Sequence, residues 1–150
     1  MIVTSGTHDR APGAAAGPVR SRPVRPVAAG AAVLTVGAGL GLRAVAAGSV
    51  AKYGGDALYT LLVLTLVVLV VPRVTPPVAA ASALVISWGV ELLQLSGIPA
   101  DLSRHSVVAR LVLGSTFDPP DLLWYAVGAG TGWLVHTAVG RRRLRAHGSR

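Results

Sequence analysis

Four runs of apolar residues dominate the chain, over residues 27–42, 57–71, 78–95 and 121–139. As a helix, the third run would be roughly 27 Å long, which approaches the roughly 30 Å thickness of the hydrocarbon core of a bilayer. We therefore predict an all-α fold, an integral membrane bundle of four transmembrane helices. A short interfacial helix should lie between the third and the fourth.

The two early connections carry clear turn signals. Gly54 and Gly55 favour a tight re-entry into the bilayer, which would place Asp56 in the first turn of the second helix, near the positive end of its dipole. The link over 72–77 is short and rich in proline. Because so short a link cannot cross the membrane, the second and third helices should be antiparallel neighbours.

The longest connection runs over residues 96–121. Within it, residues 103–113 predict a short helix that lies in the membrane interface. Asp118 and Pro119 then predict the start of the last helix, with the aspartate as N-cap and the proline at the first helical position.

The chain divides into three parts by composition. Residues 1–26 are rich in Gly, Pro, Ala, Ser and Arg and have almost no large apolar side chains. Such a segment cannot bury enough surface to offset the entropy of ordering it. We predict a disordered basic tail over 1–26, a transmembrane domain over 27–139 and a basic cytoplasmic tail over 140–150.

The overall composition is that of a membrane protein. The 150 residues are 52% hydrophobic and only 13% charged, with a mean hydropathy of +0.60, whereas a soluble domain usually has about 25% charged residues. The formal net charge is +8, but binding of nucleic acid would require a soluble domain to present a basic patch, so we expect no nucleic-acid partner. Cysteine is absent, which excludes disulfides and thiolate chemistry.

The basic residues indicate how the chain is oriented. With four spans, one side of the membrane would hold both termini and the 72–77 link, and with them ten of the 14 Lys and Arg residues. The other side would hold four. Because cytoplasmic segments of membrane proteins carry the excess of Lys and Arg, we predict that both termini are cytoplasmic.

The polar residues of the last two runs share helical faces. Ser87, Glu91 and Gln94 are separated by four and three residues, so they lie on one side of the third helix. A carboxylate facing lipid would be costly, so we expect this face to look into the bundle. The fourth run has a similar face, formed by Asp121, Tyr125, Gly128 and Gly132.

These two faces should meet at the outer side of the membrane. We expect Gly128 and Gly132 to let the fourth helix approach the third closely, which would bring Tyr125 near Glu91 or Gln94. The resulting candidate polar cluster, either ligand-binding or structural, consists of Lys52, Asp56, Glu91, Gln94, Arg110, Asp118, Asp121 and Tyr125.

Two interpretations of the cluster are open. In the structural one, Glu91 pairs with Arg110 rather than Arg104, because an aspartate three residues earlier can occupy Arg104 locally. Lys52 could pair in the same way with Asp56, four residues along the helix. In the functional one, the same groups bind a polar head at the outer leaflet. Ionisable residues inside a membrane are functional candidates, and arginine suits a phosphate or carboxylate through paired hydrogen bonds.

Catalysis has less support in the sequence. Glu91 could act as a general base and His105 could share that task, but no nucleophile motif accompanies them. The four histidines lack metal-ligand spacing, so we expect no metal and no cofactor. We assign no catalytic residue, and the sequence leaves open whether the protein is an enzyme.

Four short motifs resemble a known family. In this order, over roughly residues 30–139, they are similar to a family of small bacterial integral membrane proteins catalogued as domain of unknown function 2809. The pattern from Glu91 to Gly128 is also similar to VanZ-like proteins, which are linked to glycopeptide resistance, although those typically carry Asn where this chain has Tyr125. Both resemblances imply a compact multi-pass protein with its marked polar residues on one face. The motifs are Lys52-Tyr53-x-Gly55-Asp56-Ala57-Leu58-Tyr59, Glu91-Leu-Leu-Gln94-Leu95, Leu113-Gly114-x-x-Phe117-Asp118 and Asp121-x-x-x-Tyr125-x-x-Gly128.

We therefore expect a multi-pass protein of the bacterial plasma membrane whose biochemical role is unknown. The leading hypothesis is a non-enzymatic cell-envelope protein whose outward-facing cluster binds a lipid headgroup or an amphiphile such as a glycopeptide tail. The alternative is a membrane-embedded hydrolase or transferase that uses Glu91 and Asp121. The lipid bilayer is the one partner that the sequence implies directly, and the oligomeric state is left open.

Overall fold

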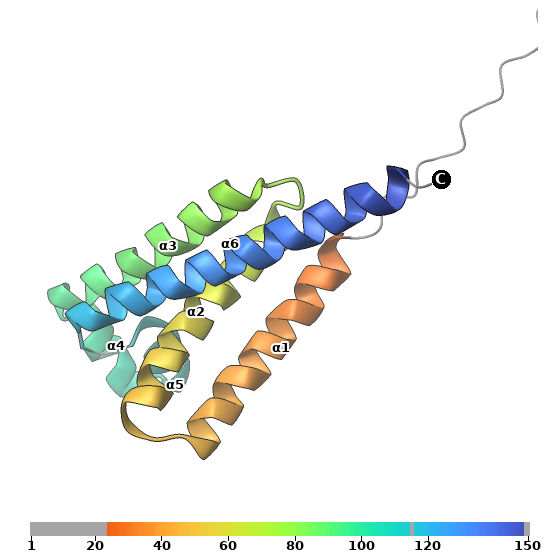
Figure 1. The fold of residues 1–150 in the computed structure, drawn as a ribbon. Coiled ribbons are helices and arrows are strands. Elements are labelled where there is room, and N and C mark those ends of the chain that lie inside the picture. Colours follow the sequence, from red (N-terminus) through yellow and green to blue (C-terminus); the bar gives the residue numbers. More distant parts are fainter. Residues whose placement is uncertain (1–23, 115, 149–150) are drawn as a thin grey trace, which may run out of the picture.

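The computed structural model describes residues 24–114 and 116–148, with side chains as far as Arg142. Every element in this part of the chain is a helix (Figure 1), so the predicted all-α class is confirmed. In chain order the elements are α1 (Val24–Val45), α2 (Gly48–Val70), α3 (Pro76–Leu93), the 3₁₀ helix η1 (Gln94–Ser96), α4 (Ile98–His105), α5 (Val107–Leu113) and α6 (Pro119–Gly148).

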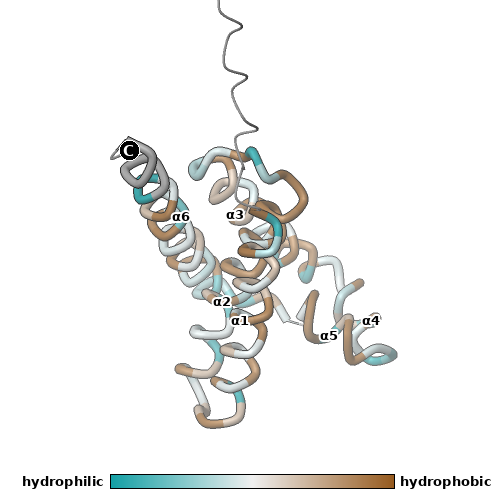
Figure 2. The backbone as a smooth tube through the Cα atoms, turned by 90° about the vertical axis from the view of Figure 1, so that its right-hand side faces the viewer, coloured by the Kyte–Doolittle hydropathy of each residue, from teal (hydrophilic) through white to brown (hydrophobic). Residues whose placement is uncertain are grey.

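The helix α2 is the centre of the fold. It contacts α1, α3 and α6, and α6 packs in addition against α3. The short helices α4 and α5 pack against each other at the end of the bundle where α2 begins and α3 ends, and the C-terminal end of α6 lies at the opposite end (Figures 1 and 2). The connection that carries α4 and α5 therefore lies beside the segments that hold the predicted polar cluster.

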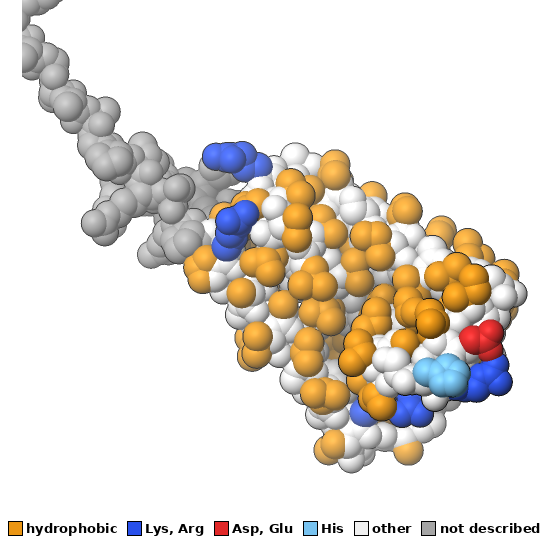
Figure 3. All heavy atoms as spheres, turned by 180° about the vertical axis from the view of Figure 1, so that it is seen from behind, with side chains coloured by type: hydrophobic (Ala, Val, Ile, Leu, Met, Phe, Trp, Pro, Cys, Tyr) orange, Lys and Arg blue, Asp and Glu red, His pale blue; other side chains and the backbone are white. Residues whose placement is uncertain are grey.

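Three helical stretches of the described chain are long and apolar enough to cross a membrane. They are α1, α2 and the continuous stretch Pro76–Ser96. Large apolar side chains on them point outward, such as Leu34, which is 76% exposed, and Val85, which is 69% exposed. Figure 3 shows hydrophobic side chains over the middle of one face and charged side chains toward its two ends. Such a surface suits lipid rather than water.

The helix α6 is 30 residues long but is not among the stretches apolar enough to be identified as spans by composition. It nevertheless packs lengthwise on α2 and α3 (Figure 1). The fourth span therefore stays a prediction.

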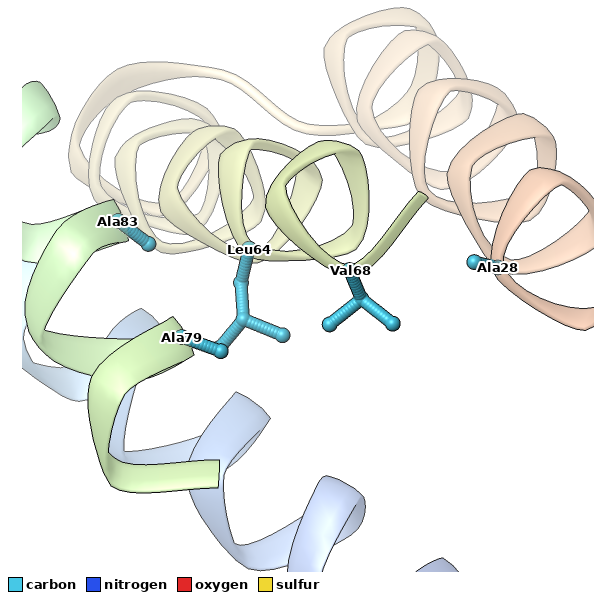
Figure 4. Packing of buried hydrophobic residues seen from close by; sticks show 5 residues of the cluster. All are labelled: Ala28, Leu64, Val68, Ala79 and Ala83. Carbon is cyan, nitrogen blue, oxygen red and sulfur yellow. The ribbon is translucent and has the colours of Figure 1, made fainter. Parts of the chain in front are cut away.

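The apolar core is built largely from small residues. Leu64 and Val68 of α2 stand between two alanines of α3, Ala79 and Ala83, and one alanine of α1, Ala28 (Figure 4). Helices in lipid gain little from hydrophobic sorting, so close approach over small side chains supplies much of their association. This packing fixes α2 as the helix against which the other long helices are positioned.

A buried hydrogen bond adds to the contact between α2 and α3. Thr60 Oγ1 donates to Ser87 Oγ at 3.0 Å, and both side chains are fully buried. The other threonine of α2 in this region, Thr65, donates to the carbonyl of Leu62 in its own helix at 2.7 Å. Ser87 therefore faces into the bundle, as predicted for the polar face of the third helix.

The reversal between α1 and α2 lies earlier than predicted. The chain turns at Ala46 and Ala47, and α2 then begins at Gly48, whose φ of +62° suits a glycine. The helix α1 begins at Val24, before the predicted start of the first run, and continues past Arg43 to its end at Val45.

Gly54 and Gly55 do not form the re-entry turn, and that prediction was wrong. Both lie inside α2, so Asp56 is not in the first turn of the helix. The packing of α1 gives a physical reason for Gly54, since a Cβ atom at this position would come within 2.5 Å of Leu42 Cδ2. The glycine gives α1 room to approach α2.

The predicted single interfacial helix over 103–113 is also wrong, because the segment forms two helices. The backbone of Ser106 is extended, with φ of −145° and ψ of 122°, and this residue separates α4 from α5. Its Oγ accepts a hydrogen bond from the backbone N–H of Ala109 at 3.2 Å, which caps α5. By contrast, α6 begins at Pro119, directly after Asp118, as predicted.

The predicted tails only partly coincide with described residues. The N-terminal tail over 1–26 lies outside them except for residues 24–26, which belong to α1. The helix α6 continues past the predicted end of the last run at Val139 and reaches Gly148.

Candidate functional site

The predicted polar residues gather where α2 begins, α3 ends and α6 begins. Lys52 Nζ of α2 donates hydrogen bonds to Asp118 Oδ2, at 2.5 Å, and to Asp121 Oδ1. The Asp121 side chain is 8% exposed, whereas those of Lys52 and Asp118 are 41% exposed. Lys52 therefore joins α2 to the start of α6, and it does not form the suggested pair with Asp56.

The carboxylate of Glu91 is the most deeply buried charged group among the described residues. Glu91 is 1% exposed. Its Oε1 accepts a hydrogen bond from the backbone N–H of Asp118 at 2.8 Å, and its Oε2 accepts one from the hydroxyl of Tyr125 at 2.9 Å. The predicted approach of Tyr125 to Glu91 is therefore confirmed.

The predicted ion pair between Glu91 and Arg110 is wrong. Among the described residues, the three ion pairs are those of Lys52 with its two aspartates and that of Arg104 with Asp101. Arg110 is exposed and takes part in none of them. The physical reason is that a buried carboxylate can be satisfied by neutral donors, here a hydroxyl and a backbone N–H beside the positive end of a helix. The expected local pairing of Arg104 is confirmed.

The side chain of Gln94 holds the end of α5 in place. Its Nε2 donates to the backbone carbonyl of Leu113 at 2.7 Å, and Ser103 Oγ donates to the carbonyl of Gly114, also at 2.7 Å. Gly114 has a φ of +67°, and a Cβ atom there would lie 2.6 Å from Gln94 Nε2. A larger residue would therefore be strained by its backbone and would collide with the amide.

A hollow of about 380 Å³ opens beside these bonds, between α1, α2, the end of α3 and α5. Its polar lining includes Asp56, Gln94 and Tyr125 and the two arginines Arg43 and Arg110. Much of the remaining lining is apolar, contributed by residues such as Val36, Leu40, Leu58, Leu62 and Leu111. The hollow thus combines charged and apolar walls.

Two acceptor atoms of the hollow's lining residues have no hydrogen-bond partner. They are Asp56 Oδ2 and Gln94 Oε1, and both are buried from solvent. The other contacts of Asp56 are a side-chain hydrogen bond with Asp121 and the nearby charges of Lys52 and Glu91. Buried acceptors are normally hydrogen-bonded, so each such exception calls for an explanation.

Aromatic side chains flank the cluster, and their pairing has no signal in the sequence. The ring of Tyr53 stacks on that of Trp124, with centroids 5.4 Å apart and an interplanar angle of 13°. Tyr59 lies beside Tyr125 at 6.2 Å. Both pairs join α2 to α6. The sequence offered no signal for Trp124, because nothing in its local pattern names a partner on another helix.

The glycine face of α6 contacts α2, whereas the prediction assigned it to the third helix. A Cβ atom on Gly128 would overlap the backbone carbonyl of Ala57, and one on Gly132 would meet the side chains of Leu61 and Leu64. The residues of α6 nearer its start do reach α3, through Tyr125 and through the bond that Trp88 Nε1 donates to the carbonyl of Leu122 at 3.0 Å. The face therefore divides between two neighbours, because α6 crosses both.

A known protein family matches the central part of the chain. The model of the family described as protein of unknown function (DUF2809) matches residues 45–129, which is more than half of the chain. The chain belongs to the DUF2809 family. The matched DUF2809 segment contains all eight residues of the polar cluster, whereas most of α1 and the second half of α6 lie outside it. No curated protein and no solved structure matches the chain.

Proposed function

We propose that this DUF2809 protein is a four-span protein of the bacterial plasma membrane that binds the polar head of an amphiphile in the hollow between α1, α2 and α5. In this proposal α6 is the fourth span and both termini are cytoplasmic, so the hollow opens at the outer leaflet. The charge count of ten basic residues against four, together with the antiparallel course of the helices (Figure 1), supports this orientation.

One observation carries the proposal. Two buried acceptors without partners, Asp56 Oδ2 and Gln94 Oε1, belong to side chains that line the same hollow as the exposed side chains of Arg43 and Arg110. The helix contacts described above use neither the two acceptors nor the two guanidinium groups. A ligand with donors and an acidic group would satisfy both.

The other polar residues of the cluster hold the walls of the hollow. Lys52 joins α2 to α6, Glu91 joins α3 to α6, and Gln94 Nε2 secures the end of α5. The cluster therefore has two kinds of members, those that fix the framework and those that line the hollow. Preorganisation of this kind lowers the ordering cost that a ligand must overcome on binding.

The apolar walls explain why the ligand should be an amphiphile rather than a free ion. Val36 and Leu40 of α1 and Leu58 and Leu62 of α2 continue the hollow away from its charged residues. A hydrocarbon chain lying there would bury apolar surface, at about 25 cal/mol per Å².

The described residues favour a binding protein over the alternative hydrolase or transferase. Both oxygens of Glu91 already accept hydrogen bonds, and the side chain is almost fully buried. Asp121 is held by Lys52. A general base must lie within hydrogen-bond reach of the proton that it removes, and neither Glu91 nor Asp121 is among the residues that line the hollow.

Native mass spectrometry of the protein purified in a mild detergent tests the proposal. The wild type should retain a phosphate-bearing amphiphile at about one per chain. Arg110→Gln should weaken retention about tenfold or more, since a hydrogen bond between charged groups contributes about 1.5–3 kcal/mol and about 1.4 kcal/mol corresponds to a factor of ten. Arg104→Gln is the matched control, because Arg104 is exposed but pairs with Asp101. Equal retention by all three proteins, or no bound amphiphile, would contradict the proposal.

A further inference from the structure

We infer that the head bound in this hollow is an amine-bearing phosphate, as in phosphatidylethanolamine, with its primary ammonium at Asp56 and Gln94 and its phosphate at Arg43 and Arg110. The inference rests on the proposed function and specifies the class of its ligand. Its support comes from the charge balance of the cluster, from the atoms left without partners and from the size of the hollow.

The acidic residues at and beside the hollow outnumber the basic residues that bind them. Asp56, Glu91, Asp118 and Asp121 lie close together, with Lys52 as the one basic residue hydrogen-bonded to any of them in the described chain. Glu91 is satisfied by neutral donors, and Lys52 is engaged by two of the aspartates. Asp56 is left with a buried oxygen that accepts no hydrogen bond. Asp56 does contact the Asp121 side chain, but that neighbour is another acid. Because two adjacent carboxyl groups repel each other when both are ionised, a ligand that brings a positive charge would stabilise this site.

Gln94 supplies the second acceptor for the primary ammonium of the ligand. Its Nε2 is committed to the carbonyl of Leu113, and this bond fixes the orientation of the amide, so Oε1 is the atom without a partner. A primary ammonium carries three N–H donors and can serve both acceptors. A quaternary ammonium has no N–H and can serve neither by hydrogen bonding. The two acceptors therefore favour a primary amine over a trimethylated one.

The two arginines that line the hollow could bind an anion. Arg43 comes from α1 and Arg110 from α5, both line the hollow, and neither takes part in an ion pair with any described residue. A guanidinium group binds phosphate through paired hydrogen bonds. A purely anionic head would leave Asp56 without a bound cation, and a purely cationic head would leave both arginines without an anion. A head with both charges satisfies all four side chains.

The size of the hollow is consistent with a head of this kind. A volume of about 380 Å³ lies at the lower end of the roughly 300–1,000 Å³ that is usual for ligand pockets. That is enough for a phosphoethanolamine group and the first part of a hydrocarbon chain, but not for a whole phospholipid. The remainder of the chains would lie along the apolar walls and the lipid-facing surface of the bundle.

A titration series that changes the ligand and leaves the protein intact tests the inference. Native mass spectrometry in mixed detergent micelles should be performed with dioleoyl phosphatidylethanolamine, its N-methyl and N,N-dimethyl derivatives, and dioleoyl phosphatidylcholine and phosphatidylglycerol. Affinity should fall stepwise as N–H donors are lost, to at least tenfold weaker for phosphatidylcholine, and phosphatidylglycerol should also bind at least tenfold more weakly. Equal affinity along the methylation series, or tighter binding of phosphatidylglycerol, would overturn the inference.

A protein variant gives a second, independent arm. Asp56→Asn keeps the shape of the side chain but removes its charge, and it should lower the affinity for phosphatidylethanolamine at least tenfold, to that for phosphatidylglycerol. The control Asp101→Asn, at an exposed carboxylate that pairs only with Arg104, should leave affinity unchanged. If Asp56→Asn binds phosphatidylethanolamine as tightly as the wild type does, the amine does not meet Asp56 and the inference fails.

The two proposals fail in distinguishable ways. Binding of the phospholipids without selectivity for the amine, but with sensitivity to Arg110→Gln, contradicts the inference and leaves the proposed function standing. Binding of none of the phospholipids contradicts both. Water-soluble glycerophosphoethanolamine provides a further arm. If it binds as tightly as phosphatidylethanolamine, the result supports an amine-bearing phosphate as the bound head. The same result overturns the proposal that the ligand must be an amphiphile.

Discussion

The hydroxyl of Tyr125 donates a hydrogen bond to the buried carboxylate of Glu91 at 2.9 Å, and this bond ties α6 to α3. With this bond, both oxygens of the Glu91 carboxylate accept a hydrogen bond, although no cation of the described residues pairs with it. Tyr125→Phe should destabilise the protein by about 1–3 kcal/mol, because Oε2 of Glu91 would be left buried without a donor. Thermal unfolding in detergent, combined with the Glu91→Gln and double variants, should show clear coupling between the two sites. Strictly additive effects would show that the bond contributes nothing.

Lys52 and Arg110 should differ sharply in their effects on stability. Lys52→Met leaves the nearly buried Asp121 without its partner and should cost about 1–3 kcal/mol, less than for a fully buried pair because Lys52 is 41% exposed. Arg110→Gln should change the free energy of unfolding by less than about 0.5 kcal/mol, since Arg110 is exposed and makes no ion pair in the described chain. Chemical or thermal unfolding of both variants measures the difference. A large loss of stability in Arg110→Gln would support an ion pair between Arg110 and Glu91.

Gly128 and Gly130 form a matched pair on α6. Gly128→Ala should destabilise the protein by about 1–3 kcal/mol or more, because the new methyl group would collide with the backbone of Ala57 on α2, which cannot move aside as a side chain can. Gly130→Ala meets nothing within 4 Å and should be neutral or stabilising by about 0.5–1 kcal/mol, because alanine has the higher helix propensity. Abundance in membranes and thermal stability report both effects. Equal sensitivity at the two positions would contradict the packing of α6 on α2.

The membrane topology can be tested with single cysteines, since the chain contains none. Cysteine introduced at Thr116, an exposed position before α6, should react with an impermeant reagent in intact cells. Cysteine introduced at Thr75, an exposed position in the link between α2 and α3, or at Gly140 in α6, should react only after the membrane is opened. Labelling of Thr116 and Gly140 from the same side would show that α6 does not cross the membrane, and the reverse pattern would invert the orientation.

The helical fold was predictable from the sequence because its physical cause is local. The runs 57–71 and 78–95 are strongly apolar, and the helices that contain them, α2 and the stretch Pro76–Ser96, are long and apolar enough to span a bilayer. The positions of the turns were less predictable. Gly54 and Gly55 have the composition of a turn, but they lie inside α2, where Gly54 gives α1 room to approach. From the sequence alone, a glycine that permits a turn cannot be told from one that permits a helix contact.

The candidate cluster was predictable in its members but not in its pairing. Helical spacing placed Glu91 on an inward face, and the match of that face with Tyr125 followed from the level of the two residues in the membrane. The pairing of Lys52 with Asp118 and Asp121 did not follow, because it depends on how α2 and α6 are rotated against each other. The same reason explains the error at Arg110. Charge complementarity suggests a partner, but a backbone N–H and a hydroxyl satisfied Glu91 equally well.

The most direct test of the account is to map where a lipid head meets the protein. A photoreactive phosphatidylethanolamine, with the reactive group near the head, should be incorporated into nanodiscs with the intact protein, and the labelled peptides should be identified by mass spectrometry. If the head binds in the hollow, labelling should be concentrated in the segments that line it, around Arg43, Leu58 and Arg110, and should be lost in the Arg110→Gln variant. Labelling spread evenly over the lipid-facing positions of the bundle, such as Leu34 and Val85, and unchanged by that substitution, would contradict it.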